Sequence, residues 1–359
     1  MASALSAAEQ TATGAGPGIH GRLDFLWLEL TNRCNLRCVH CYTDSHPHAG
    51  DRDILALDDY LSLLRQAFDL GCRKVQLIGG EPQLNRDFFR ILEAAVDMGF
   101  EFIEVFTNLT HLDETTLRYS AEHGIHFATS VYSAEPAEHD AITGVRTSHA
   151  RTTSNLRRLI DQGIETRAAV IALDQEAPSI VRTKRYLKDM GVPEVRHSEV
   201  REFGRGQNIL DREANLQGLC GHCWSGKLCI APDGDAYPCV MARHWPVGNV
   251  REASLAEIVG GMGLKDMRQE IYTSVWLPKL EDYRARQSLQ NGIHAKACMP
   301  GSSPPDTDPG EKNPDGTDNP DPEECPQSCV PTDGKTCGPH ACPQSCTPFI
   351  VVCEPTGDE

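Results

Sequence analysis

The chain has 359 residues, 15 cysteines and a formal net charge of −17. Its 40% hydrophobic content suits a globular protein of two or three domains, and the acidic charge argues against nucleic-acid backbones and anionic membranes as partners. No run approaches roughly 18 apolar residues, and the start of the chain has no secretory pattern, so a cytoplasmic protein is expected. In a reducing compartment, many cysteines indicate metal or redox chemistry before disulfides.

The first expected strand is followed directly by three cysteines. The apolar run 25–31 precedes Cys34, Cys38 and Cys41, which have the spacing C-x3-C-x2-C. Such a short loop brings three thiolates around one iron–sulfur cluster. Three ligands for four irons leave one iron open, as the binding of a small molecule requires. The alternative is a zinc site that His40 completes.

The second expected strand, 74–79, follows an amphipathic stretch, Leu57–Leu70, and ends in two glycines, an acid and a proline. These residues are Gly79, Gly80, Glu81 and Pro82. Glycines let the backbone approach a ligand closely, and a strand end offers carbonyls and a carboxylate to an ammonium group. The segment therefore predicts a binding site for an amino-acid moiety.

The two motifs together resemble the radical S-adenosylmethionine (SAM) superfamily, because they lie on successive strands. The resemblance implies that the open iron of a [4Fe-4S] cluster is chelated by SAM, and that the segment 79–82 holds the methionine ammonium. It also implies that an aromatic residue just before the third cysteine lies near the adenine. His40 takes that place here.

Residues 25–200 alternate short apolar runs with amphipathic helical patterns such as Asp87–Met98. The expected strands are 25–31, 74–79, 102–107, 126–131, 167–173 and 194–199. Six repeats of strand and helix predict parallel strands joined by right-handed crossovers. The fold class is therefore α/β, and the pattern matches the partial (β/α)6 TIM-like barrel of the family. Ligands in such barrels bind at the carboxyl ends of the strands.

Three further cofactor-binding candidates stand at those strand ends. Asn108 belongs to a Thr-Asn pair that resembles a family motif, although Leu109 replaces its glycine. The resemblance assigns Ser130 to the SAM ribose, with a turn-capping hydroxyl as the alternative. It assigns Arg201 or Arg205 to the SAM carboxylate, with a solvated surface arginine as the alternative. The sequence identifies no catalytic acid, base or hydrogen donor.

A second cysteine group follows the barrel. A turn at Pro232–Asp235 predicts a hairpin, with cysteines on its arms and a C-x2-C pair ahead of it. The group contains Cys220, Cys223, Cys229 and Cys239. A zinc ribbon is one interpretation. After the two motifs above, the segment resembles the SPASM or twitch extension, which implies one or two auxiliary iron–sulfur clusters and Cys298 as a further ligand.

The sequence thus divides into four predicted parts. Residues 1–21 are expected to be disordered, 22–210 to form the barrel, and 211–298 to form a small α+β cysteine-rich auxiliary-cluster domain. Residues 299–359 form a Pro/Cys-rich tail with 12 acids and 2 bases. The tail completes a second auxiliary cluster, forms an independent metal knuckle, or is a low-complexity appendage.

The resemblance implies reductive cleavage of SAM to a 5′-deoxyadenosyl radical, which abstracts hydrogen from an unactivated carbon. An electron donor such as flavodoxin or ferredoxin is implied, and an auxiliary cluster would accept the electron left after a bond forms. The favoured substrate is a ribosomally synthesised precursor peptide, oxidatively modified by cross-linking. Its leader would be recognised by a separate protein, by the barrel mouth or by the tail.

Three other functions remain open at this point. One is a radical SAM dehydrogenase or epimerase of a small molecule such as an aminoglycoside or a nucleotide. Another is a twitch enzyme like the one that starts molybdopterin synthesis, whose terminal Gly-Gly is absent from this sequence. The last is a non-enzymatic iron–sulfur or zinc protein, although an electron carrier needs no pocket for an amino acid.

Overall fold

The computed structural model describes residues 21–173 and 178–285. The expectations for the N-terminal residues 1–20, for Cys298 and for the tail 299–359 therefore lie outside the described residues. Within the described residues, no helix is long and apolar enough to cross a membrane.

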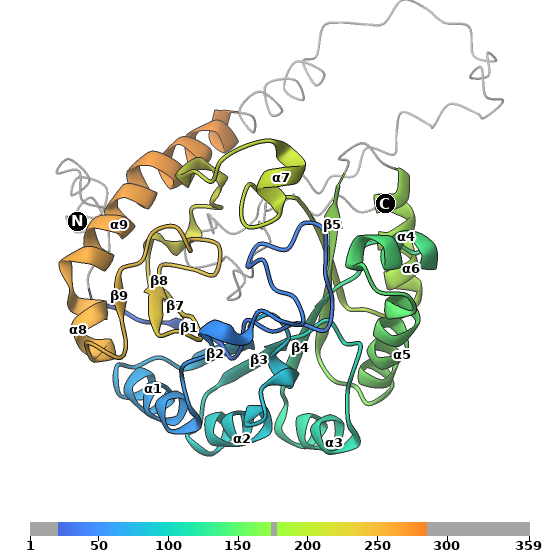
Figure 1. Cartoon of the computed structure of the whole chain (residues 1–359), viewed down its shortest axis with the longest axis horizontal. Helices are drawn as coiled ribbons and strands as arrows, with labels where there is room; N and C mark the ends of the chain where they lie inside the picture. The colour runs from blue at the N-terminus through green and yellow to red at the C-terminus, as the bar shows by residue number, and fades with distance from the viewer. Residues whose placement is uncertain (1–20, 174–177, 286–359) are drawn as a thin grey trace, which may run out of the picture. The chain divides into compact units, whose positions relative to one another are not determined.

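The predicted partial barrel is confirmed. Six parallel strands stand in the order β6-β5-β4-β3-β2-β1, each neighbour following in the sequence. They are β1 (Phe25–Glu29), β2 (Lys74–Ile78), β3 (Phe102–Phe106), β4 (His126–Ser130), β5 (Thr166–Ala172) and β6 (Glu194–Glu199). The crossover helices lie on the outer side of the curved sheet (Figure 1).

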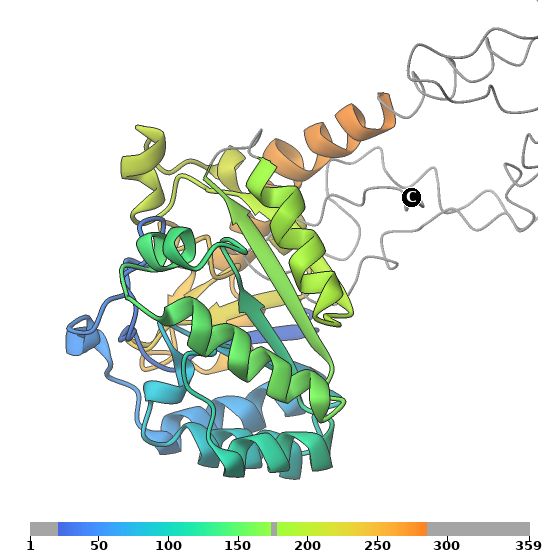
Figure 2. The ribbon, with the colours of Figure 1, turned by 90° about the vertical axis from the view of Figure 1, so that its right-hand side faces the viewer.

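The barrel helices form where apolar residues recur every three or four positions. In chain order they are α1 (Leu57–Asp69), α2 (Phe88–Asp97), α3 (Glu114–His123), α4 (Pro136–Thr143), α5 (Ser148–Asp161) and α6 (Pro178–Asp189). In α3, the Asp113 carboxylate accepts from the Thr116 amide at the start, and Gly124 ends the helix with φ of 63°. Figure 2 shows these helices packed along the outside of the strands.

Strand β1 is buried on both faces, as expected of a central parallel strand. Leu26 and Leu28 belong to the core between sheet and helices. Phe25 and Trp27 belong to a second core, together with residues of the second cysteine segment such as Leu219. The inside of the barrel is therefore closed by the part of the chain that follows it.

The second cysteine segment continues the same sheet. Strand β7 (Lys227–Ile230) pairs in parallel with β1, and Trp27 lies opposite Cys229. Strands β8 (Asp235–Tyr237) and β9 (Gly248–Asn249) then add in antiparallel fashion, which confirms the hairpin at residues 232–235. The described residues after β6 also contain the α-helices α7 (Gly206–Leu210), α8 (Leu255–Gly260) and α9 (Met262–Ile271), and a π-helical turn (Tyr272–Trp276).

A buried polar row crosses the inside of the barrel. Arg167 on β5 donates to both carboxylate oxygens of Glu104 on β3, at 2.7 and 2.8 Å, and Gln76 on β2 also donates to Glu104. Each of these residues precedes a cavity-lining residue of its own strand, so the row lies toward the amino-terminal ends of the strands. The open space of the barrel is therefore at its carboxyl end.

Candidate functional site

One cavity occupies the carboxyl ends of the barrel strands, with a volume of about 940 Å³ including its open mouth. The structure brings together in its wall the predicted residues Cys34, Cys38, His40, Cys41, Gly79, Gly80, Asn108, Ser130 and Arg201. Glu81 and Pro82 are buried beside it rather than in its lining.

The sulfur atoms of the cysteine loop accept weak hydrogen bonds from three sides. The Cys34 sulfur accepts from the Leu36 amide and the Cys41 sulfur from the Ser45 amide, both at 3.4 Å. The Tyr132 hydroxyl donates to the Cys38 sulfur at 3.7 Å. Such donors stabilise thiolates and cluster-bound sulfur.

Burial raises the pKa of the Cys38 thiol to about 12 and also raises that of Cys34. These thiols stay protonated unless a metal displaces the proton. In the described part of the chain, no three Cys, His, Asp or Glu side chains converge on one point, as the ligands of a single zinc ion would. Three cysteine thiols on one loop are the donor set that an iron–sulfur cluster uses.

His40 packs edge-on against Tyr132, with 4.8 Å between the ring centroids. Burial, together with the nearby charge of Arg205, lowers the pKa of His40 to about 4. Its ring is neutral at physiological pH, and among the described residues its Nδ1 has no hydrogen-bond partner. A neutral aromatic ring at the cavity wall is compatible with the predicted place beside the adenine.

The Gly-Gly-Glu-Pro segment is tied directly to the cysteine loop. The Gly80 amide donates to the Thr31 carbonyl and the Glu81 amide to the Arg33 carbonyl, both at 2.8 Å. A Cβ atom on Gly80 would overlap the Arg33 carbonyl. The glycine is thus required by the packing of β2 on the loop, a reason that the sequence prediction did not include.

Glu81 connects two strand ends. One of its carboxylate oxygens accepts from the Thr107 hydroxyl and the other from the Asn108 amide, both at 2.8 Å. Burial raises the pKa of Glu81, while these hydrogen bonds oppose the rise. Its carboxylate therefore holds β3 beside β2, and the Asn108 side chain in turn donates to Asn35 in the cysteine loop at 2.7 Å.

Arg205, which follows β6 in the chain, also binds the cysteine loop. Its guanidinium donates to the carbonyls of Cys38 at 2.9 Å and Ser45 at 2.8 Å, and it pairs with Asp44. Gly204 lies so close to the Cys41 carbonyl that a Cβ atom would overlap it. The sequence suggested Arg205 as a candidate for the SAM carboxylate and did not indicate that its guanidinium binds carbonyls of the cysteine loop.

The second cysteine group lies behind the cavity wall. The side chains of Cys223 and Cys239 lie within hydrogen-bond distance, and Cys220 is close enough to Cys223 to act on it electrostatically. Cys229 is buried beside Glu29 and Arg243. The four described cysteines of this group form no disulfide and do not line the cavity. Met241, two residues after Cys239, does line it, and no sequence signal indicated this.

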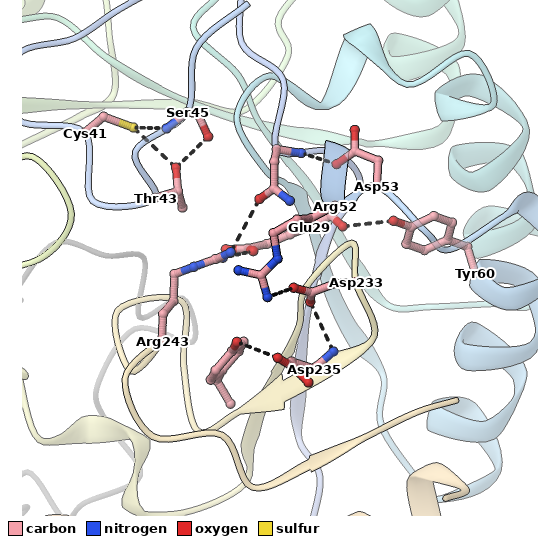
Figure 3. A network of polar contacts seen from close by, with 12 residues as sticks. Glu29, Cys41, Thr43, Ser45, Arg52, Asp53, Tyr60, Asp233, Asp235 and Arg243 are labelled. Atoms are coloured by element: carbon pink, nitrogen blue, oxygen red, sulfur yellow. Dashed lines mark hydrogen bonds and ion pairs between the residues drawn. The ribbon is translucent and has the colours of Figure 1, made fainter. Parts of the chain in front are cut away.

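Two ion pairs join the second cysteine segment to the first loop (Figure 3). Arg243 pairs with the buried Glu29 of β1 and also donates to Asn32 at 3.4 Å. Arg52 pairs with Asp233 in the hairpin turn at 2.5 Å. Next to Arg52, Asp53 accepts from the Thr31 hydroxyl and the Asn32 amide. The cysteine loop and the hairpin are therefore held together on both flanks.

Family comparisons agree with this geometry. The family model of the Radical SAM superfamily matches residues 28–183, and the SPASM model, an iron–sulfur cluster-binding domain, matches residues 220–277. The subtilosin biosynthesis protein AlbA of Bacillus subtilis is 26% identical over 263 residues, which are 64% of this chain and 58% of AlbA. A probable GTP 3′,8-cyclase of Methanothermobacter thermautotrophicus is 39% identical, but over 26% of this chain and 30% of its own.

Solved structures share the fold. Streptococcus suis SuiB bound to S-adenosylmethionine superposes with a TM-score of 0.57 at 18% identity, over 69% of this chain and 68% of SuiB. The Radical SAM match assigns a [4Fe-4S] cluster and SAM to the barrel, and the SPASM match assigns auxiliary iron–sulfur to the segment after it. Both matches fall on the two cysteine groups described above, so the chain belongs to the radical SAM superfamily and carries a SPASM domain.

Proposed function

We propose that this protein reductively cleaves SAM and uses the resulting radical to oxidise a ribosomally synthesised precursor peptide, joining two of its side chains. One observation carries the proposal: a single cavity connects the three loop cysteines with Met241, which the second cysteine segment supplies. A substrate in that cavity would lie between two iron–sulfur sites.

The cluster with bound SAM would supply a 5′-deoxyadenosyl radical after one-electron reduction. The thiolates of Cys34, Cys38 and Cys41 would hold the cluster. The backbone at residues 79–80 would bind the methionine end of SAM, and Asn108 and Ser130, which also line the cavity, would contact the rest of it. Ile78, Phe106 and Ile171 give the cavity an apolar wall that limits water near the reacting carbon.

A peptide substrate is supported by the relatives. AlbA is named for the biosynthesis of the antilisterial bacteriocin subtilosin, and SuiB has been solved with the precursor peptide SuiA at 16% identity to this chain. The cavity is open at its mouth, and β6 ends the sheet there, so an extended chain can enter. The second site would accept the electron released as the cross-link forms. Flavodoxin or ferredoxin would supply the first electron, and a separate protein would present the leader.

The test is anaerobic reconstitution of the clusters, followed by their reduction in the presence of SAM. The wild type should release 5′-deoxyadenosine, and a variant with Cys34, Cys38 and Cys41 changed to Ala should release none while keeping part of its iron. Co-expression with the small precursor frame expected beside this gene should give a peptide that is lighter by two hydrogen atoms per cross-link.

Two results would contradict the proposal in different ways. No 5′-deoxyadenosine from the reconstituted wild type would overturn SAM cleavage itself. An unchanged peptide mass, with turnover of an aminoglycoside or of GTP, would place the protein among small-molecule enzymes. The similarity to GTP 3′,8-cyclases is confined to about a third of this chain or less, so it favours that outcome less.

A further inference from the structure

Arg201 lies between the cavity and the second cysteine group. It follows β6 by two residues, is 8% exposed and lines the cavity. One of its terminal nitrogens, Nη1, donates to the Gly218 carbonyl at 2.5 Å. Within residues 21–173 and 178–285, its Nε and Nη2 are buried and have no hydrogen-bond partner. Two donors on a buried cation are therefore left over.

The groups around this guanidinium are mostly thiols. Burial lowers the pKa of Arg201, and Cys220, Cys239, Glu202 and Cys223 oppose that effect electrostatically. Three of these four are cysteines of the SPASM match. In contrast, Arg205, the other candidate for the SAM carboxylate, donates its hydrogen bonds to backbone carbonyls of the first cysteine loop. The two arginines of this segment thus face different cysteine groups.

Leaving two nitrogen donors of a buried cation unpaired is energetically unfavourable. An iron–sulfur cluster held by the neighbouring thiolates would remove this cost, because its sulfurs accept hydrogen bonds and its thiolates carry negative charge. Hydrogen bonds to the sulfurs and a nearby positive charge raise the reduction potential of a cluster. The sulfurs of such a cluster would therefore supply the acceptors that the two unpaired nitrogens of Arg201 lack.

We propose that Arg201 donates hydrogen bonds to the auxiliary cluster bound by Cys220, Cys223 and Cys239 and raises the reduction potential of that cluster. The cluster can then accept the electron that the substrate releases as its cross-link forms. Arg201 is thus assigned to the second cluster. The sequence had instead suggested Arg201 or Arg205 as the partner of the SAM carboxylate. The inference rests on the proposed function, in which the auxiliary cluster is the electron acceptor, and Arg201 acts through the cluster as a positioning residue.

The experiment isolates the auxiliary cluster in the full-length chain. In a background with Cys34, Cys38 and Cys41 changed to Ala, the remaining iron–sulfur signal is titrated with reductant and followed by electron paramagnetic resonance. Arg201→Met should shift the midpoint to lower potential and change the signal shape, because both donors and the charge are lost. Arg201→Lys, which keeps the charge, should shift it less. Arg212→Met, at an exposed arginine 11 residues further along the chain, should leave it unchanged.

A second measurement separates the two roles. With the cysteine loop intact, Arg201→Met should bind SAM within about twofold of the wild type. An unchanged midpoint in Arg201→Met, or tenfold weaker SAM binding with an unchanged midpoint, would overturn the inference. If Arg201→Met fails to assemble the cluster, Arg201→Lys decides in the same way. Release of 5′-deoxyadenosine by the wild type tests SAM cleavage independently of all these outcomes.

Discussion

At the scale of single residues, the cysteine loop is held by contacts that leave no room for a side chain. Gly80 has the Arg33 carbonyl against it, and Gly204 has the Cys41 carbonyl against it. These neighbours are backbone atoms that cannot rotate away. The loop geometry, and with it the placement of three thiolates, depends on glycines that come from two other parts of the chain.

We expect Gly80→Ala to lose iron and SAM binding together. The added methyl must displace the Arg33 carbonyl, at a cost of roughly 1–3 kcal/mol, and the cysteine loop moves with it. Gly260→Ala, where a Cβ atom meets nothing within 4 Å, is the matched control. Iron content and SAM affinity after anaerobic reconstitution check this. Full iron with lost SAM binding would instead mean that the side chain blocks the ligand.

His139 gives the barrel a pH dependence. It is 1% exposed, and its Nδ1 accepts from the Tyr132 amide at 3.2 Å, so protonation breaks this hydrogen bond. Burial lowers the pKa of His139 to about 4, with a further contribution from His149 and an opposing one from Asp140. Because the folded pKa lies below the unfolded value of about 6.5, this contribution to stability is present above pH 6.5 and is lost toward pH 4.

The free energy of unfolding should therefore fall by up to about 3 kcal/mol from this residue between pH 6.5 and pH 4. His139→Asn keeps an acceptor near the Nδ1 position and cannot titrate, so its stability should depend less on pH. His123→Asn, at an exposed site, should retain the wild-type slope. Urea unfolding across this pH range measures both. Equal slopes for His139→Asn and the wild type would contradict the assignment.

At the scale of elements, the β7–β8 hairpin is fastened to β1 by hydrogen bonding and by charge. Glu29 is 1% exposed and its partner Arg243 comes from the segment after the hairpin. Figure 3 shows the two side chains directed toward each other, with Arg52 and Asp233 forming a second link. The first cysteine loop begins between these two links, so the hairpin helps to set its position.

Arg243→Met should destabilise the protein by about 3–5 kcal/mol, because Glu29 is left charged and buried without its partner. Arg22→Met removes an exposed ion pair with Asp24 and should cost less than about 1 kcal/mol. Adding Glu29→Gln to Arg243→Met should recover part of the loss, since the uncompensated charge is gone. Urea titration of the four proteins checks this, and equal losses for the two arginine variants would refute it.

At the scale of the whole described body, barrel and SPASM segment are one sheet. Strand β1 pairs with β2 on one side and with β7 on the other, and residues of both parts fill the core around Trp27. Residues 21–278 accordingly fall within a single compact unit. The predicted domain boundary near residue 210 therefore does not interrupt the sheet, which continues from the barrel strands into the SPASM segment.

This predicts that the two parts unfold together. Backbone amides in β1 and β7 should exchange with the same free energy of opening in native-state hydrogen exchange, because loss of β7 exposes the apolar inner face of β1. Amides in α6, on the outside near the open edge of the barrel, should exchange more easily. Earlier exchange of β7 than of β1 would show that the SPASM segment opens on its own.

Short-range features were predictable from the sequence. Three cysteines within eight residues must share one loop, the strand boundaries follow apolar runs, and the turn at 232–235 places its own hairpin. The barrel and the family were therefore predicted correctly. In each case the residues that carry the signal are neighbours in the chain, so local periodicity and spacing are sufficient.

Long-range pairings had to come from the folded chain. Glu29 meets Arg243, Cys38 meets Arg205, and β1 meets β7, across some 170 to 210 residues. No periodicity relates such partners, because their meeting depends on how the sheet closes and where each crossover returns. The same closure turns Gly80 toward a backbone carbonyl and leaves Arg201 beside the second cysteine group, since burial and spare hydrogen-bond donors exist only after packing is complete.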